Sequence, residues 1–379
     1  MRNSTRRHFL IAGATLIAGA VGVQAKQETP SGAAVSVPQK RRNQWEPAKT
    51  WVFAVGVIQY PDGQAWPQEG RRDVEWIAQL KSCGVPAAQI LYLQDKAATL
   101  SDTQKAFGTF LAKMPADAML WFYFTGHGTK STGGTGAFVL YDNNWSIPTV
   151  LSTIERRFAG KTALLFADCC YSGSLGMEAM LRAGHVSYGV LTSSLSSTVS
   201  TGAWTFTECL LAGLRGAVQI DTEDDGFIDF LELSRFAERE MAMNDGQLST
   251  FVATNGFDAR FALVPCLARG NPRLGEYIEA KSKDGKWYPG RIEQVNNGAF
   301  WVRWVGYSES ENEWVSEMNT RTYIPKQLAL GSKVSVEWNG KYYPAEVLAG
   351  RWGMHLVHYH GYEDFWDEWV APNRLRPVA

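Results

Sequence analysis

Two cysteines directly follow an acidic residue at the end of an apolar run. Residues 164–167 (Leu-Leu-Phe-Ala) form a short hydrophobic block, the pattern expected of a strand buried on both faces of a parallel sheet. Asp168, Cys169 and Cys170 come next, and small residues at 172–174 supply a turn toward a helix. Parallel sheets place their chemistry at the carboxyl ends of strands. A thiol at such an end is a candidate nucleophile.

A histidine ends a second apolar run earlier in the chain. Residues 119–124 (Met-Leu-Trp-Phe-Tyr-Phe) lead into Thr125-Gly126-His127-Gly128. The flanking glycines let the backbone bend sharply around His127. A nucleophilic thiol needs a base within hydrogen-bond reach, and two neighbouring strand ends can supply that pair. The pattern predicts a Cys/His dyad, and only one of the two adjacent thiols should reach it because neighbouring strand residues point to opposite sides.

These two motifs resemble those of the caspase-like cysteine peptidases, nearest to the bacterial and metacaspase branch. Residues 125–128 correspond to that family's Ser-Gly-His-Gly, and residues 168–173 (Asp-Cys-Cys-Tyr-Ser-Gly) to its Asp-x-Cys-His-Ser-Gly. The resemblance covers residues 48–265. Tyr171 stands where metacaspases usually have His, and Thr125 replaces Ser, but the dyad itself is retained.

The resemblance implies a role for each motif residue. His127 is the general base or acid, and Cys170 is the nucleophile. The backbone N–H groups of Gly128 and Cys170 form the oxyanion hole. In this family two acids, here Asp73 and Asp168, form an acidic S1 pocket for Arg or Lys, and paired carboxylates would stabilise a guanidinium and repel an acidic side chain. The alternative for Asp73 is a first-turn helix acid favoured by the helix dipole.

The alternation of strands and helices predicts an α/β fold. It indicates a caspase-like α/β/α sandwich with a mostly parallel sheet over residues 48–265, followed by two small all-β barrels. Helices are expected near residues 69–81, 101–113 and 205–214, and the polar run 193–201 is expected beside the active site. Strands at 250–254 and 260–264 would complete the sheet.

The first 25 residues differ in character from the rest of the 379-residue chain. Ser4-Thr-Arg-Arg-His-Phe-Leu10 precedes an Ala/Gly-rich apolar run, and Val23-Gln-Ala25 is a small-x-small cleavage pattern, which resembles a twin-arginine signal. Residues 26–47 are expected to form a disordered linker. The expected location is therefore periplasmic or secreted, with no stable membrane span after signal cleavage. An uncleaved anchor is the alternative.

The composition fits a free catalytic thiol. The chain has 45% hydrophobic residues and a formal charge of −1, so no charge bias points to nucleic acid. Five cysteines are an odd number for a chain bound for an oxidising compartment, so at least one thiol stays free or pairs outside the chain.

An acidic segment matches the spacing of a calcium loop. Its predicted ligands lie in one twelve-residue stretch with Gly226 at the turn: Asp221, Glu223, Asp225, Phe227, Asp229 and Glu232. Calcium is the one cofactor that the sequence suggests, and none is required for the chemistry. The alternative is an acidic turn whose Asp229 starts the following helix.

The C-terminal part contains an internal duplication with an offset of 55 residues, seen when Trp287-Tyr-Pro289 is superposed on Tyr342-Tyr-Pro344. The copies, residues 272–325 and 328–379, resemble the tudor-knot or chromo-barrel family, in which aromatic side chains at one barrel end can cage a methylated cation. The alternative is that these aromatics fill the barrel cores. The cage candidates are Trp304, Tyr307, Trp314, Tyr359, Tyr362 and Trp369.

Residues 268–379 hold 14 basic and 14 acidic residues, which disfavours binding to a phosphate backbone. His355, His358 and His360 are interpreted as surface or packing residues rather than metal ligands. The sequence thus predicts an exported cysteine endopeptidase that cleaves after Arg or Lys, with barrels that bind a protein or peptide. The alternatives are a non-catalytic envelope scaffold and a transpeptidase using the same thiol.

Overall fold

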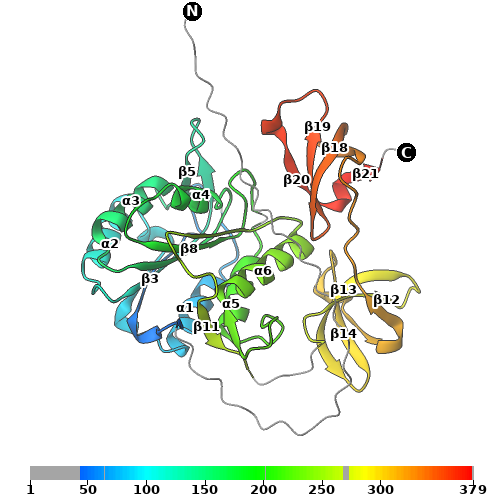
Figure 1. Ribbon diagram of the computed structural model, residues 1–379, viewed down its shortest axis with the longest axis horizontal. Coiled ribbons are helices and arrows are strands. Elements are labelled where there is room, and N and C mark those ends of the chain that lie inside the picture. The colour runs from blue at the N-terminus through cyan, green and yellow to red at the C-terminus, as the bar shows by residue number, and fades with distance from the viewer. Residues whose placement is uncertain (1–42, 64, 201, 268–272, 378–379) are drawn as a thin grey trace, which may run out of the picture. The chain divides into compact units, whose positions relative to one another are not determined.

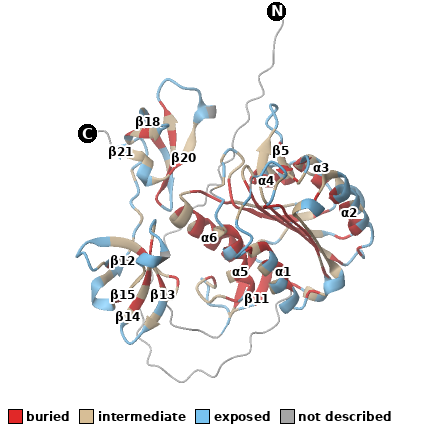
Figure 2. Ribbon diagram, turned by 180° about the vertical axis from the view of Figure 1, so that it is seen from behind, coloured by how far each residue is buried: buried red, intermediate tan, exposed pale blue. Residues whose placement is uncertain are grey.

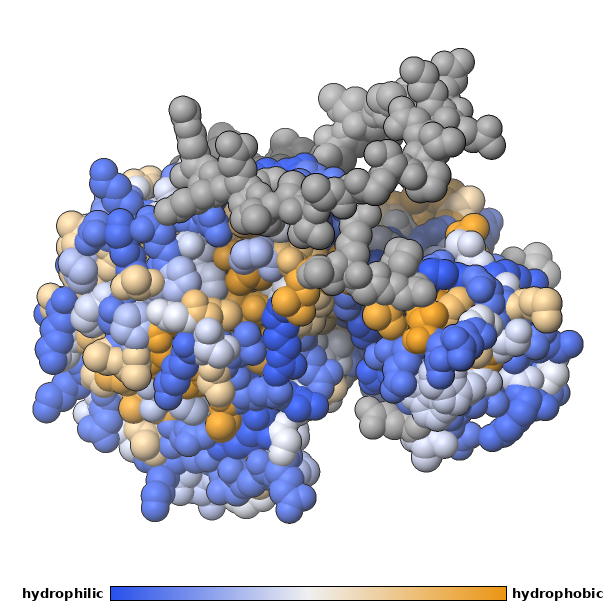
Figure 3. Space-filling view, turned by 90° about the horizontal axis from the view of Figure 1, so that it is seen from below, coloured by the Kyte–Doolittle hydropathy of each residue, from blue (hydrophilic) through white to orange (hydrophobic). Residues whose placement is uncertain are grey.

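The computed structural model describes residues 43–63, 65–200, 202–267 and 273–377. The signal-peptide prediction and residues 26–42 of the predicted linker lie outside these residues. Within them, no helix combines the length and the hydropathy needed to cross a bilayer. The face drawn in Figure 3 is mostly hydrophilic, with apolar residues gathered in a few patches.

A six-stranded sheet in the order β10-β8-β7-β3-β1-β2 forms the centre of the α/β unit (Figure 1). The first five strands in chain order pair in parallel and β10 runs antiparallel at the edge. The strands span Thr50–Gly56 (β1), Ile90–Gln94 (β2), Met119–Thr125 (β3), Thr162–Asp168 (β7), Ser187–Thr192 (β8) and Thr250–Thr254 (β10).

Helices cover both faces of this sheet (Figure 2). Helices α2, α3 and α4 pack with one buried cluster, and α1, α5 and α6 pack with the other. Alternate residues of the strands supply the two cores, as Phe122 and Trp121 do from β3. The helices span Arg72–Ser82 (α1), Leu100–Ala112 (α2), Ile147–Arg157 (α3), Ser174–Met180 (α4), Thr205–Leu214 (α5) and Phe230–Glu240 (α6). The expected α/β/α sandwich with a mostly parallel sheet is confirmed.

Two small sheets lie beside the main one. Strands β4 (Gly128–Lys130), β5 (Gly136–Val139) and β6 (Asn144–Ser146) form an antiparallel sheet after His127. Strand β9 (Phe227–Asp229) pairs with β11 (Ala262–Pro265). The expectation that residues 260–264 complete the central sheet was therefore wrong, because β11 pairs with β9 instead.

Residues 43–47 also differ from the prediction. They were expected to belong to a disordered linker, but Trp45 is only 4% exposed, and its ring stacks on Trp121 with centroids 4.6 Å apart. The N–H of Trp45 donates to the carbonyl of Ala262 at 2.8 Å. A tryptophan buries a large apolar surface, so this segment belongs to the packed fold.

The duplicated region forms two five-stranded antiparallel sheets of the same order, each with its own core cluster. Both copies carry a register shift at the equivalent place, between Ile292 and Gln294 and between Val347 and Ala349. The repeat read from the sequence is thus a structural repeat. The strands span Tyr277–Lys281 (β12), Trp287–Asn296 (β13), Ala299–Trp304 (β14), Glu313–Ser316 (β15) and Thr320–Thr322 (β16), then Lys333–Trp338 (β17), Lys341–Arg351 (β18), Met354–Tyr359 (β19), Glu368–Val370 (β20) and Leu375–Pro377 (β21).

Candidate active site

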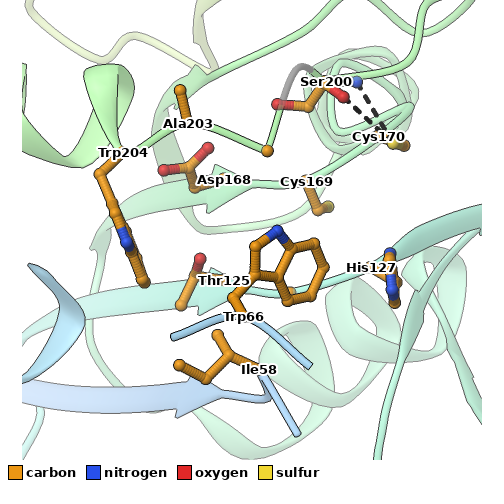
Figure 4. Close-up of a pocket in the computed structure, with 12 residues that line it drawn as sticks. Ile58, Trp66, Thr125, His127, Asp168, Cys169, Cys170, Ser200, Ala203 and Trp204 are labelled. Atoms are coloured by element: carbon orange, nitrogen blue, oxygen red, sulfur yellow. Dashed lines mark hydrogen bonds between the residues drawn. The ribbon is translucent and has the colours of Figure 1, made fainter. Parts of the chain in front are cut away.

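The dyad residues leave the sheet at one edge. Strands β3 and β7 are parallel neighbours whose last pair is Thr125 and Asp168. His127 and Cys170 each follow that pair by two residues, and both line one cavity of about 170 Å³ (Figure 4). The cavity is lined by Ile58, Trp66, Thr125, Gly126, His127, Asp168, Cys169, Cys170, Ser200, Gly202, Ala203 and Trp204.

His127 is held by its backbone and by two aromatic rings. Its N–H donates to the hydroxyl of Tyr60 at 2.8 Å. The imidazole centroid lies 4.8 Å from that of Tyr60 and 4.5 Å from that of Trp66. Burial lowers the pKa of His127, which favours the neutral imidazole that can accept a proton. Gly126 has φ +146, and a Cβ there would meet the carbonyl oxygen of Val57 at 2.6 Å, so the approach requires glycine.

The Cys170 sulfur contacts the loop that follows β8. The backbone N–H of Ser200 donates to Sγ at 3.2 Å. The next residue, Tyr171, has φ +57, and its N–H donates to the carbonyl of Thr198 at 2.9 Å. A non-glycine residue in the left-handed region marks a sharp turn at the nucleophile position. The polar run 193–201 does reach the cavity, as the sequence predicted, through Ser200.

Cys169 borders the same cavity but is a poor nucleophile. It is 2% exposed and belongs to the core cluster on the α2, α3 and α4 side. Burial raises the pKa of its thiol well above the ordinary value, so it stays protonated. Cys170 is more exposed and is the better candidate.

The predicted oxyanion-hole residues are close neighbours. A Cβ built on Gly128 would lie 1.9 Å from the carbonyl oxygen of Cys170, so the two backbones pack directly against each other. The two segments are therefore adjacent, and the oxyanion hole itself stays a prediction.

Asp168 is a buried acid within the cavity. It is 6% exposed, and its Oδ2 accepts a hydrogen bond from the Thr207 hydroxyl at 2.7 Å. Burial raises the pKa of Asp168 to about 7, against the opposing hydrogen bonds from Thr207 and Ser193. No lysine or arginine is among the described residues that line the cavity. The partners of this carboxylate are therefore neutral hydroxyl groups.

Asp73 is not among the residues that line the cavity, in contrast to the prediction for S1. It is fully buried at the start of α1, where Arg71 donates to both of its oxygens and the Tyr92 hydroxyl donates to Oδ2 at 2.5 Å. Because Arg71 already neutralises it, Asp73 supplies no free charge to a substrate. Its position in the first turn of α1 agrees with the alternative interpretation.

The sequence did not indicate several residues of the site. Ile58, Trp66 and Trp204 line the cavity, and Tyr60 contacts His127. All four come from loop segments or helix ends without a motif. The aromatic character of Tyr60, Trp66 and Trp204 was the one available signal, and such residues are far commoner in cores.

Two buried serines form hydrogen bonds that stabilise the turn after Cys170. The hydroxyls of Ser172 and Ser194 lie 3.0 Å apart, and each also accepts the N–H of the other residue at 3.1 Å. Ser194 Oγ donates to the Cys169 carbonyl at 3.0 Å. This network ties the turn after β7 to the loop after β8.

The acidic segment at 221–232 adopts a turn that begins α6. Asp229 is the N-cap of the helix, and it forms a capping box with Glu232. Glu232 Oε1 accepts the N–H groups of Thr222 and Glu223, and Arg260 contacts both Glu223 and Asp229. These contacts favour the alternative of a structural acidic turn, and calcium binding stays a prediction.

The described residues contain one group of three side chains whose ligand atoms lie within 4.8 Å of one another, namely His358, Asp364 and Asp367. It belongs to the second barrel and shares no residue with the acidic segment 221–232. The Nδ1 atom of His358 is 2.8 Å from Oδ1 of Asp367, a distance that a hydrogen bond explains.

Aromatic clusters occur at equivalent places in both barrels. Tyr288 contacts Trp304 and Tyr307, with centroids 6.1 and 5.7 Å apart. Two of the residues predicted to form aromatic cages lie outside these clusters. Trp314 contacts Trp301, and Trp369 has no ring contact with the other predicted cage residues among those described. In the second barrel, rings 5.6–6.4 Å apart connect Trp338, Tyr343, Tyr359, Tyr362 and Trp366.

The two clusters differ in charge. The first borders a cavity whose charged lining residues are three acids and one base, namely Asp284, Glu311, Glu313 and Lys283. In the second barrel, the counterpart of Glu313 is Glu368, which Arg374 holds at 2.7 and 2.9 Å. Trp304 and Tyr359 are 5% and 4% exposed, so they also serve the core.

Comparison with known proteins agrees with this division of the chain. Residues 328–377 match the model of the Tudor-knot family, described as the RNA binding activity-knot of a chromodomain. None of the curated proteins matches the chain.

Several solved structures are similar to part of the chain. A Geobacter sulfurreducens protein is 16% identical, with a TM-score of 0.41 over 56% of this chain and 96% of its own. Caspase-1 from Spodoptera frugiperda is 15% identical, with a TM-score of 0.42 over 61% and 97%. The Drosophila initiator caspase Dronc is 10% identical, with a TM-score of 0.38 over 64% and 95%. The family-model match thus falls on the second barrel, residues 328–377.

Proposed function

We propose that this protein is an exported cysteine endopeptidase that cleaves after Arg or Lys. One observation supports it above the others: His127 and Cys170 line the same cavity as Asp168, whose described lining holds no basic side chain. In the proposed reaction His127 takes the thiol proton and Cys170 attacks the scissile carbonyl. The backbone N–H groups of Gly128 and Cys170 then stabilise the oxyanion. The C–N bond breaks as His127 returns the proton to the leaving amine, and water hydrolyses the thioester on Cys170 to release the acid and the thiol.

The test compares the two adjacent cysteines. Cys170→Ala should abolish cleavage of reporter peptides that contain Arg or Lys, whereas Cys169→Ala should keep it, because Cys169 is a buried thiol. A reactive Cys170 should also be alkylated by iodoacetamide in the folded protein at neutral pH. Equal loss in both variants, or no activity in the parent protein, would contradict the assignment.

Two other functions use the same fold. An unreactive Cys170 would favour a non-catalytic scaffold. A transpeptidase shares the acyl-enzyme and differs only in the second nucleophile, so adding an amine acceptor and analysing the products by mass spectrometry separates it from a hydrolase.

The barrels are proposed to bind a peptide of the substrate or of a partner. The acidic, aromatic cavity of the first barrel supports a cationic ligand. The Tudor-knot description names RNA, but basic and acidic residues balance in this region. Titration with a labelled RNA at two salt concentrations would detect such binding by its salt dependence.

Export through the twin-arginine route is proposed from the sequence alone. Substitution of Arg6 and Arg7 by Lys should retain the protein in the cytoplasm, which cell fractionation would show.

A further inference from the structure

The walls of the cavity determine more than the sign of the charge it accepts. Figure 4 draws Asp168 and Trp204 on one side of Trp66, with His127 and Cys170 on the other. All five residues line the same cavity. A substrate side chain that extends from the dyad to Asp168 therefore passes along indole rings.

Charge alone would not discriminate between the two basic side chains here. The second predicted carboxylate, Asp73, is bound by Arg71, which leaves Asp168 as the one carboxylate among the described lining residues. A single carboxylate attracts an ammonium and a guanidinium alike. Any preference must come from the rest of the cavity.

The indole rings of Trp66 and Trp204 can distinguish a guanidinium from an ammonium. A guanidinium is planar and weakly hydrated, and it stacks on aromatic faces while donating several hydrogen bonds in its plane. An ammonium is compact and strongly hydrated, so apolar walls penalise it more. We propose that the cavity selects Arg over Lys at P1, with Trp204 as the specificity-determining wall. This inference rests on the proposed function and names its preferred substrate.

Trp204 is a better test position than Trp66. The Trp66 ring contacts His127 at 4.5 Å, so its removal would also disturb the proposed base. Trp204 lies at the start of α5, where its carbonyl accepts the N–H of Glu208 at 2.8 Å. That backbone bond does not depend on the side chain, so the helix start should survive truncation.

The experiment measures kcat/KM for two reporter peptides that differ only in Arg or Lys at P1. The parent protein should prefer Arg by about tenfold or more, and Trp204→Leu should lower that ratio about fivefold, mainly through loss of Arg cleavage. Trp204→Phe, which keeps an aromatic face, should retain most of the preference. Trp287→Leu, at an exposed tryptophan of the first barrel, is the matched control and should leave the ratio unchanged.

Thermal melting and alkylation of Cys170 verify that each variant is folded, and Trp204→Met replaces the leucine variant if that one does not fold. Equal cleavage of both peptides by the parent protein would overturn the selectivity while leaving the peptidase assignment intact. An unchanged ratio in Trp204→Leu would overturn the role of Trp204. Cleavage of neither peptide would instead overturn the proposed function, and this inference with it.

Discussion

The guanidinium of Arg71 holds both carboxylate oxygens of Asp73, with N–O distances of 3.0 and 2.6 Å. Arg71 also donates to Asp95 at 2.6 Å, and Asp95 accepts the N–H groups of Ile58 and Gln59. The pair therefore ties α1 to the loop that carries cavity residues.

Breaking this pair should destabilise the fold. Arg71→Met leaves a fully buried carboxylate without its counter-ion, which costs about 3–5 kcal/mol. Denaturant unfolding of Arg71→Met, Asp73→Asn and the double variant would measure the coupling. Arg72→Met is the matched control, because Arg72 is partly exposed and its loss should cost less than about 1 kcal/mol. Independent, additive effects of the Arg71 and Asp73 changes would contradict the pairing.

Cleavage of Arg peptides should depend on pH through Asp168. The ionised carboxylate binds the cation, and the pKa of Asp168 is about 7 in the free protein, so kcat/KM should fall as pH decreases below 7. His127 should not cause this acidic limb of the pH profile, because burial lowers the pKa of its imidazole. In Asp168→Asn the limb should disappear along with most activity on Arg peptides. A limb that persists in this variant would assign it to another group.

Ionisation of Asp168 should lower the stability of the fold. As pH rises, the free energy of unfolding should therefore decrease, whereas kcat/KM should increase. Burial raises the pKa of Asp168 above its unfolded value, so its contribution is most favourable at low pH and is lost as pH rises through about 7. Asp168→Asn should therefore gain roughly 1–3 kcal/mol at pH 8 and little at pH 5, measured by denaturant unfolding. A loss of stability at pH 8 would contradict this cause.

Gly128→Ala should abolish activity, because the new Cβ would lie 1.9 Å from the Cys170 carbonyl oxygen and must push the two segments apart. A decrease in kcat of about 100-fold or more is expected, since such displacement disturbs the proposed oxyanion donors. Gly133→Ala is the control in the same hairpin, where the nearest atom is 3.8 Å from the new Cβ. Full activity in Gly128→Ala would exclude this arrangement.

Glu232→Gln should lower stability without calcium. Its carboxylate accepts the N–H groups of Thr222, Glu223 and Asp229, so weakening them costs about 1–2 kcal/mol. The shift in Tm should persist in a chelator. A shift seen only with calcium present would instead support a calcium site.

The sequence predicted the sheet and the position of its chemistry for a local reason. Apolar runs such as residues 164–167 can be buried only between two layers, and polar residues directly after them fall at the sheet edge. The parallel register then places the residues after β3 and β7 together. The duplication was equally visible, because Gly and aromatic positions recur with one offset.

The sequence by itself predicted the candidate nucleophile, its candidate base and the repeat, since each depends on residue type and spacing along one segment. Only the tertiary structure decided which charged side chains pair and which residues line the cavity. Arg71 neutralises Asp73, Arg260 contacts the acidic turn, and Trp204 reaches the cavity of Cys170, because contacts between distant segments depend on packing that no local pattern encodes.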